Sequence, residues 1–212
     1  AAGNPRVLAE RIRLAREKGL DDDPTRAAER ILGLVAALSV HDRKTRGHSE
    51  RVRAFTDLLA VEVGLAAGER DRLRWAALLH DIGKLEVPSV TLNKTGKPDE
   101  AEWELIKRHP LEGQRIAAPL LPWLGAWGDV IAQHHEHFDG TGYPASLAGT
   151  SICLGARIVT IADAFEVMTA ARSYKRPMTP TAARRELARC AGTHFDSDIV
   201  RAFFSISIGR LW

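Results

Sequence analysis

The sequence predicts an all-α domain, and three observations support this prediction. Segments with helical periodicity follow one another along nearly the whole chain, whereas the period-two alternation of half-buried strands is almost missing. Glycine, proline and N-capping residues stand where one helical segment gives way to the next. The 212 residues are 45% hydrophobic and 27% charged, which is typical of one soluble domain with a sizeable core.

The first half of the chain is expected to contain helices over residues 6–18, 24–39, 45–63, 69–82 and 99–108. Asp23 is an N-cap residue that precedes Pro24, and proline is favoured at the first helical position. Gly64 and Gly83 are expected to end the third and fourth helices, because glycine readily adopts the left-handed conformation of a C-cap. The segment 86–98 is rich in turn residues and predicts a loop.

In the second half, a proline- and tryptophan-rich segment at 119–127 leads into a helix that is expected to reach residue 136. The stretch 138–150 is glycine-rich and irregular, and loops of this kind often carry function. Further helices are expected over 152–172, over 179–191 and from 196 onward. We divide the chain into an N-terminal helical region, 1–44, which is a linker or a pair of dimerisation helices, and a main domain, 45–212.

Charge and hydropathy exclude two kinds of partner. The 30 lysines and arginines exceed the 27 acidic residues by only three, which is too small a surplus to predict nucleic-acid binding. The longest nearly unbroken apolar run, 31–40, is about half the length of a bilayer-spanning helix. We therefore expect no direct insertion of this segment into a membrane.

The cysteines and the chain ends bear on location. Cys153 and Cys190 have no metal-binding spacing and are too few for a disulfide scaffold, which favours a reducing, cytoplasmic location. The chain begins with Ala1 and has no basic-then-apolar leader, so we expect no retained signal peptide. The apolar end, 203–212, suggests that a further domain or membrane segment follows in a longer parent protein.

Histidines are frequent, with eight in the chain, and two of them are expected to point inward. His48 shares a helical face with three apolar residues that follow it at i+4, i+7 and i+11, and His80 follows Leu73 by seven residues. A single inward histidine is more often a core residue than a ligand. Asp81 stands directly after His80, and the two can reach one cation from the same helix, whereas the other such pair, at 41–42, lies in a charged stretch that predicts a helix end.

Asp163 is the strongest anomaly, because it lies in the mostly apolar helical segment 158–165. A buried carboxylate needs a partner, which is either a distant side chain or a metal ion. Further nitrogen donors follow helical segments at His109, His134 and His135. Together these histidines and aspartates could fill two metal sites, and mixed histidine and carboxylate ligands suit iron, manganese or zinc better than magnesium or calcium. Two such ions are a device for phosphoester hydrolysis.

The remaining polar residues fit a phosphate substrate. Lys84 follows His80 by one helical turn, and Arg172 and Lys175 follow the Asp163 helix. Each cation by itself would more often be a surface charge, but cations beside a metal pair favour an anion between them. The sequence 139–144, Asp-Gly-Thr-Gly-Tyr-Pro, predicts a turn with close backbone approach and an aromatic ring, that of Tyr143, which can stack on a base or hydrogen-bond to phosphate.

These motifs, in this order, resemble those of HD-GYP domains, the cyclic di-GMP phosphodiesterase branch of the HD superfamily. The matching segments are 48–52, 80–84, 107–113, 134–136, 139–144 and 157–165, and the resemblance covers nearly the whole chain. It implies an HD-superfamily helical bundle with a short glycine-rich Gly-Tyr-Pro loop. It also implies hydrolysis of cyclic di-GMP, either to pGpG or onward to GMP, by a hydroxide that two metal ions activate.

The resemblance also assigns roles by position. One metal would be held by His48, His80, Asp81 and Asp163, and the other by Asp81, as the bridge, with His109, His134 and His135. The catalytic residues would be Asp81 and Lys84, and the substrate-binding residues would be Lys84, Gly142, Tyr143, Arg172 and Lys175. Two divalent ions per chain are expected, either iron or manganese.

The chain departs from the family pattern at a few positions. Members with a third metal have a glutamate where this chain has Lys44, so we expect two metals. Glu166 replaces an aspartate that is frequent in the family, and His137 replaces an arginine at the rim. His194 matches no motif, and we expect it to be structural.

Two alternatives to the enzyme interpretation stay open at this stage. The domain could be a cyclic di-GMP-binding or signalling module with little or no turnover, or an HD hydrolase that acts on another phosphoester. We also expect a homodimer formed by residues before Thr45, and a diguanylate-cyclase or regulatory domain beside this one in the parent protein.

Overall fold

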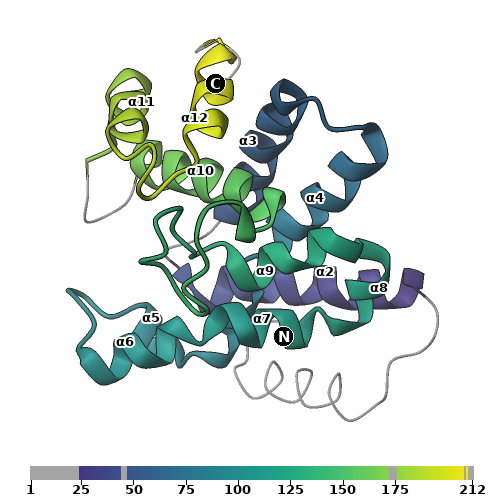
Figure 1. The fold of residues 1–212 in the computed structure, drawn as a ribbon. Helices are drawn as coiled ribbons and strands as arrows, with labels where there is room; N and C mark the ends of the chain where they lie inside the picture. Colours follow the sequence, from purple (N-terminus) through teal and green to yellow (C-terminus); the bar gives the residue numbers. More distant parts are fainter. Residues whose placement is uncertain (1–23, 44–46, 172–175, 208, 210–212) are drawn as a thin grey trace.

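The computed structural model describes residues 24–43, 47–171, 176–207 and 209, and it confirms the all-α prediction for this part of the chain. Figure 1 shows how the helices are arranged, and their buried apolar side chains form a hydrophobic core. In chain order they are α2 (Pro24–His41), α3 (His48–Val63), α4 (Ala67–Leu79), η2 (Ile82–Glu86), α5 (Ser89–Leu92), α6 (Glu100–Lys107), α7 (His109–Ile116), η3 (Ala118–Leu120), α8 (Leu121–Leu124), η4 (Gly125–Gly128), α9 (Asp129–Gln133), η5 (Gly149–Ser151), α10 (Leu154–Thr169), α11 (Pro180–Arg189) and α12 (Ser197–Ser205).

The centre of the domain is formed by α3, α4 and α10. Helix α3 packs against both α4 and α10, and α7 packs against η2 and α9. Helices α11 and α12 cover one end of α10 (Figure 1). The fully buried side chains of Leu59, Leu73, Ile161 and Phe165 belong to the helices that meet there. Burying such side chains is the main contribution that holds the bundle together.

Several helix boundaries follow the capping residues, as expected. Asp99, Thr179 and Asp196 are the N-caps of α6, α11 and α12, and each side chain accepts a hydrogen bond from a backbone N–H of the first turn. Gly64 ends α3 in the left-handed conformation, with φ 86°. Gly47 is also left-handed, with φ 69°, so α3 begins at residue 48 instead of residue 45.

The predicted helix over 69–82 is wrong at its C-terminal end. Helix α4 stops at Leu79, and the chain continues through residues 80 and 81 into the 3₁₀-helix η2. Gly83 lies inside η2 and does not cap a helix. A Cβ atom on Gly83 would lie 1.9 Å from the backbone oxygen of His109, so the glycine allows η2 to approach α7 closely. Similarly, α10 ends at Thr169, before residue 172, because Ala170 has an extended conformation.

Helix α2 packs against η2 and η3, and its residues Ile31 and Leu38 belong to the core. The expected helix over 6–18 and residues 44–46 lie outside the described residues, so the division between 1–44 and 45–212 stays a prediction. None of the described helices is both long and apolar enough to cross a membrane.

The glycine-rich stretch 138–150, which we call the GYP loop, connects α9 to α10 (Figure 1). Its first residues are anchored to the loop between α11 and α12. The backbone N–H of Phe138 donates to the oxygen of His194 at 3.1 Å, and that of Asp139 donates to the oxygen of Thr193 at 2.8 Å. These contacts fix the GYP loop beside the end of α9.

Candidate active site

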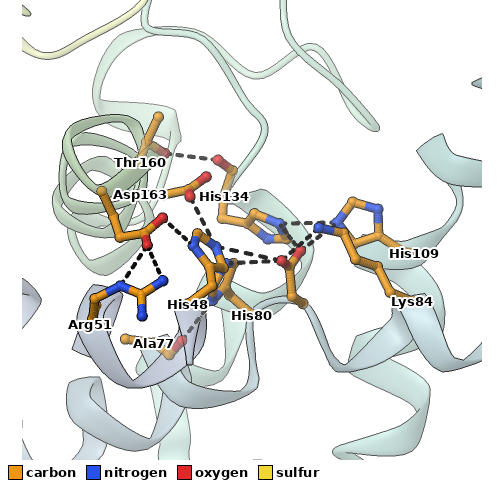
Figure 2. Close-up of polar contacts among 11 residues, drawn as sticks. His48, Arg51, Ala77, His80, Lys84, His109, His134, Thr160 and Asp163 are labelled. Atoms are coloured by element: carbon orange, nitrogen blue, oxygen red, sulfur yellow. Dashed lines mark hydrogen bonds and ion pairs between the residues drawn. The ribbon is translucent and has the colours of Figure 1, made fainter. Parts of the chain in front are cut away.

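The residues expected to bind metal come from five places in the chain and meet between the helices. Figure 2 labels five of them, His48, His80, His109, His134 and Asp163. His48 is the first residue of α3, and Asp163 lies within α10. His80 and Asp81 occupy the break between α4 and η2, His109 begins α7, and His134 and His135 directly follow α9. Most of the set thus lies at helix ends. The helices that lead to these residues, α4 and α9, end at Leu79 and Gln133, earlier than the predicted helices over 69–82 and up to 136.

The side chains form two groups that share a border. In the first, which we call cluster A, ligand atoms of His48, His80 and Asp163 all lie within 4.8 Å of one another. In the second, cluster B, the same holds for Asp81, His109, His134 and His135. All seven residues that the sequence singled out therefore belong to one of the two clusters.

Asp81 faces both clusters with different oxygens. Its Oδ2 lies 3.7 Å from His48 Nε2 and 3.5 Å from His80 Nε2, which belong to cluster A. Its Oδ1 lies 3.3 Å from His109 Nε2 and 3.8 Å from His134 Nε2, which belong to cluster B. A carboxylate in this position can provide one oxygen to each of two cations.

Three of the imidazoles are oriented by the backbone of the preceding helical turn. The Nδ1 atoms of His80, His109 and His134 lie 2.6, 2.7 and 3.0 Å from the carbonyl oxygens of Ala77, Ile106 and Ile131, each three residues earlier. Donation from Nδ1 to these oxygens leaves each Nε2 available for a ligand. Such partners fix the tautomer and orientation of metal-binding histidines.

His48 is held differently, by a carboxylate from another helix. Its Nδ1 lies 2.5 Å from Oε2 of Glu166 on α10, and Arg51 donates from Nε to the other carboxylate oxygen at 2.7 Å. The Nε2 of His48 lies 3.2 Å from Asp163. Burial alone would lower the pKa of His48, but the hydrogen bonds with Asp163 and Glu166 raise it to about 9. A metal at this nitrogen would therefore have to displace a proton.

For His80, His134 and His135 burial is the largest influence, and the net shift of the pKa is downward. Burial lowers the pKa of His80 and His134, and it lowers the pKa of His135 to about 3, with a contribution from the neighbouring His109. These rings are therefore neutral at pH 7, which is the form that binds metal.

The donor set fits divalent cations, and one orphaned atom supports this directly. The Nε2 of His80 is buried without a hydrogen-bond partner, although it points toward Asp81 and the other ligands. An unpaired buried nitrogen costs stability unless something else binds it. Nitrogen donors with carboxylates and no thiolate suit iron, manganese or zinc.

Lys84 lies at the edge of the two clusters. Its Nζ is 2.7 Å from Oδ2 of Asp81, and its side chain is 17% exposed (Figure 2). Burial would lower the pKa of Lys84, but the charges of Asp81 and Asp42 outweigh burial and raise it. Lys84 is therefore a cation at neutral pH. Asp42, which is buried directly after α2, thus helps to keep Lys84 charged. The sequence analysis did not predict this role, because only the fold brings Asp42 near Lys84.

Gly142 and Tyr143 bring the GYP loop against the histidines. A Cβ atom on Gly142 would lie 2.3 Å from the backbone nitrogen of His137, so only glycine fits there. The ring of Tyr143 stacks on His135, with centroids 4.8 Å apart. Burial and the charges of Asp81 and Asp163 raise the pKa of Tyr143, so its phenol stays protonated at neutral pH.

Glu136 holds the GYP loop, a role that the sequence did not reveal. Its buried carboxylate accepts hydrogen bonds from the backbone N–H groups of Ala145 at 2.7 Å and Leu147 at 2.9 Å. The position directly after two ligand histidines was the only sequence signal. The anchoring fixes the loop that carries Tyr143.

The structure leaves some expectations untested. Lys44, Arg172 and Lys175 lie outside the described residues, so their expected roles stay predictions. His137 and His194 stack on each other with ring centroids 3.8 Å apart, and His194 also stacks on Phe195. Neither belongs to a metal cluster.

Comparison with known proteins identifies the family. A family model described as an HD domain matches residues 33–199, which is most of the chain. The chain belongs to the HD domain family. Within that family, HD-GYP proteins share the motifs that the sequence carries, and the expected resemblance is confirmed.

Curated relatives of this HD domain are phosphodiesterases of cyclic dinucleotides. The chain is 45% identical over 134 residues to the 3′3′-cGAMP-specific phosphodiesterase 3 of Vibrio cholerae, covering 63% of this chain. It is 39% identical over 173 residues, or 82% of this chain, to the cyclic di-GMP phosphodiesterase PA4108 of Pseudomonas aeruginosa. The chain spans only 29% and 41% of the length of these two relatives.

Two solved structures share the fold. A cyclic GMP-AMP-specific phosphodiesterase of Vibrio cholerae has a TM-score of 0.62 and 21% identity, with 81% of this chain and 46% of that chain covered. An HD-GYP-type protein of Bdellovibrio bacteriovorus has a TM-score of 0.61 and 16% identity, with 95% and 69% covered. These similarities confirm the HD-GYP fold of the helical bundle.

Proposed function

We propose that this HD domain hydrolyses a phosphodiester bond of cyclic di-GMP, giving pGpG or, after a second hydrolysis, GMP. The observation that carries the proposal is Asp81, whose two oxygens face two separate histidine clusters beside the cation of Lys84. A pair of cation sites with a further positive charge at the rim is suited to a substrate with a phosphodiester. The relatives named as cyclic di-GMP phosphodiesterases support the choice of substrate.

The chain would hold two divalent ions, iron or manganese. Cluster A with Asp81 would bind one ion, and cluster B would bind the other. When bound, such a pair supplies an activated water and neutralises charge on the phosphate. Glu166 would orient the His48 ring toward its ion, and the backbone carbonyls would do the same for His80, His109 and His134.

Lys84 and Tyr143 would contact the substrate directly. The ammonium group of Lys84 can donate a hydrogen bond to a non-bridging phosphate oxygen and balance the charge that develops during hydrolysis. The protonated phenol of Tyr143 can donate a second hydrogen bond, and Gly142 lets the loop approach closely. Arg172 and Lys175 are proposed to bind the second phosphate.

A second candidate substrate is 3′3′-cGAMP. It is favoured by the 45% identity over 134 residues to a cGAMP-specific phosphodiesterase. Both substrates have the same ring of two 3′,5′-phosphodiesters and differ in one base. The metal clusters and Lys84 therefore act on either, and the residues around the bases would decide between them.

The deciding experiment measures metal content and reaction products together. Protein purified without oxygen is expected to contain about two iron or manganese ions per chain, and to convert cyclic di-GMP to pGpG or GMP. Parallel assays with 3′3′-cGAMP and with a linear dinucleotide compare the substrates. Two metals with binding but no product would identify a receptor, and absence of metal would overturn the proposal.

Matched variants test the site itself. His80→Ala and Asp81→Asn are expected to lose metal and turnover together, with activity reduced at least about 100-fold. Asp57→Asn is the control, because this aspartate pairs with Arg74 away from the clusters. Full activity in metal-stripped His80→Ala protein would contradict the proposed chemistry.

Three broader expectations remain proposals. We propose that the domain works in the cytoplasm, that it dimerises through its N-terminal helices, and that a regulatory or diguanylate-cyclase domain lies beside it in a longer protein. Sedimentation of the purified chain tests the dimer directly.

A further inference from the structure

Trp103 stands out because a large aromatic side chain is left in solvent near the proposed site. It lies on α6, and its side chain is 43% exposed. None of the residues of α6 is buried, and Figure 1 shows α5 and α6 at one edge of the molecule. Packing of the core therefore does not explain why a tryptophan occupies this position.

Helix α6 is held firmly at its first turn. Asp99 and Glu102 form a capping box, in which the Asp99 side chain accepts from the Glu102 N–H and the Glu102 side chain accepts from the Asp99 N–H. Lys94, from the preceding loop, donates to the same Glu102 carboxylate at 2.6 Å. The first turn thus has a fixed place despite its exposure.

The last turn of α6 is joined to cluster B. The carbonyl oxygen of Ile106, one turn after Trp103, is the partner of His109 Nδ1 at 2.7 Å. The same helix therefore orients a proposed metal ligand and presents the indole. This connection fixes the position of Trp103 relative to the place where the phosphate would bind.

A continuous series of rings leads from cluster B to Trp103. His109 and His135 lie edge to face with centroids 5.0 Å apart, His135 and Tyr143 are stacked at 4.8 Å, and Tyr143 and Trp103 lie edge to face at 6.3 Å. The first ring of this series, that of His109, is buried, and the last ring, the indole of Trp103, is exposed. A ligand with a phosphate at one end and a flat aromatic ring at the other would match both ends.

We propose that Trp103 is a stacking platform for one nucleobase of the substrate. The inference rests on the proposed function, because it assumes that a nucleotide phosphate binds at the two clusters. Every base has an aromatic face, so stacking on an indole tolerates different bases. Trp103 therefore increases affinity for nucleotide phosphodiesters over those without a base, and it leaves the choice between guanine and adenine to other residues.

Steady-state kinetics of the manganese-loaded protein test the platform. Trp103→Ala is compared with wild type on cyclic di-GMP and on an abasic analogue of the same cyclic dinucleotide, which has both phosphodiesters and both riboses but no aromatic ring. The loss of kcat/KM on cyclic di-GMP is expected to be about 10- to 100-fold and to exceed the loss on the abasic analogue at least tenfold. Most of the loss should appear in KM, and Trp103→Phe should restore most of the affinity.

Trp123 provides a matched control. It is 42% exposed, on α8, where it contacts Trp75 and Arg72. Trp123→Ala is expected to change neither substrate's kcat/KM more than about twofold. Equal losses on both substrates in Trp103→Ala, or no loss on either, would overturn the platform.

A binding measurement separates this proposal from the proposed function. Calorimetry compares GMP with ribose 5-phosphate, which has the phosphate and sugar but no base. Wild type is expected to bind GMP at least tenfold more tightly, and Trp103→Ala is expected to lose that preference. This test needs no turnover. If the protein hydrolyses no cyclic dinucleotide, the proposed function fails, but the preference for GMP over ribose 5-phosphate still shows whether Trp103 binds a base. Equal affinity of wild type for the two compounds would overturn the platform.

Discussion

Four of the five histidines of the proposed site are each held in one of two ways. His80, His109 and His134 each have a backbone carbonyl partner three residues earlier, whereas His48 is held by Glu166, 118 residues away on α10. The first arrangement is formed within one helical turn. The second requires α3 and α10 to pack correctly, and it adds the charge of a carboxylate that Arg51 also binds.

This comparison shows which parts of the site are independent of distant side chains. A carbonyl at a helix end is present whenever the helix forms, so no side-chain substitution removes it. A carboxylate partner can be removed by a single substitution, and its charge makes the histidine more basic. The orientation of His80, His109 and His134 should therefore change only when the packing of the helices changes. The orientation of His48 should change when one side chain, that of Glu166, is substituted.

The largest effect is expected from Gly83→Ala, which alters how the helices meet. The new Cβ would overlap the His109 backbone oxygen, and η2 and α7 would have to separate. We expect the free energy of unfolding to fall by about 3 kcal/mol, measured by urea denaturation. Gly33→Ala is the control, because nothing lies within 4 Å of its Cβ position in α2, and it should be neutral or stabilising. Similar behaviour of the two variants would contradict the close contact.

The next effect concerns the carboxylate that holds His48. Glu166→Gln removes the charge that His48 and Arg51 share, and the affinity for one of two manganese ions is expected to fall about 10- to 100-fold. The other ion should bind as in wild type, because cluster B has its own carbonyl partners. Titration calorimetry resolves the two sites. Glu50→Gln, an exposed change in the same first turn of α3, is the control. If the affinity for both ions fell equally, the proposed difference between carbonyl-held and carboxylate-held histidines would be wrong.

A smaller effect is expected at the carboxylate that holds the GYP loop. Glu136→Gln weakens the hydrogen bonds to the backbone N–H groups of Ala145 and Leu147, each worth about 1–2 kcal/mol. Amide hydrogen exchange at these two residues should become about tenfold faster. Ser146→Ala removes only the bond of the Ser146 hydroxyl to Gly142 and serves as the control. Unchanged exchange at both amides would show that the loop does not depend on Glu136.

The smallest effect is expected at His194, whose ring stacks on the rings of His137 and Phe195. Burial and the nearby His137 lower its pKa from 6.5 to about 4. Between these values the unfolded chain binds more protons than the folded one, so the contribution of His194 to stability is present above pH 6.5 and is lost as pH falls toward 4. On going from pH 7 to pH 5, wild type should lose about 1 kcal/mol more than His194→Gln, since solvent screens a half-buried ring. Urea denaturation at both pH values measures the difference, and equal losses would contradict it.

Much of the site could be predicted from local sequence. The apolar face shared by His48 and Val52 indicated that this imidazole points inward. The carboxylate of Asp163 in an apolar helix and the glycines of the GYP loop indicated function without knowledge of the fold. These signals are local, because helical periodicity and turn preference depend on residues within a few positions of one another. They identified the residues that the structure brings into the two clusters.

Other features depended on packing between distant segments. Only the tertiary structure showed that Glu166 and Arg51 support His48, that Glu136 anchors the loop, and that Trp103 lies at the end of a series of rings. The sequence also did not predict that the helix over 69–82 is interrupted. The interruption lies beside the contact of Gly83 with α7, which forms only in the folded protein.

The sequence by itself therefore determined the helical class, the family and the identity of the candidate metal ligands. The tertiary structure decided how these ligands divide into two clusters, with one oxygen of Asp81 toward each, and which side chains hold them. The physical reason is that the types of reactive side chain and the local periodicity depend only on the order of residues along the chain. Distances between side chains more than 100 residues apart are set only when the helices pack around a common core.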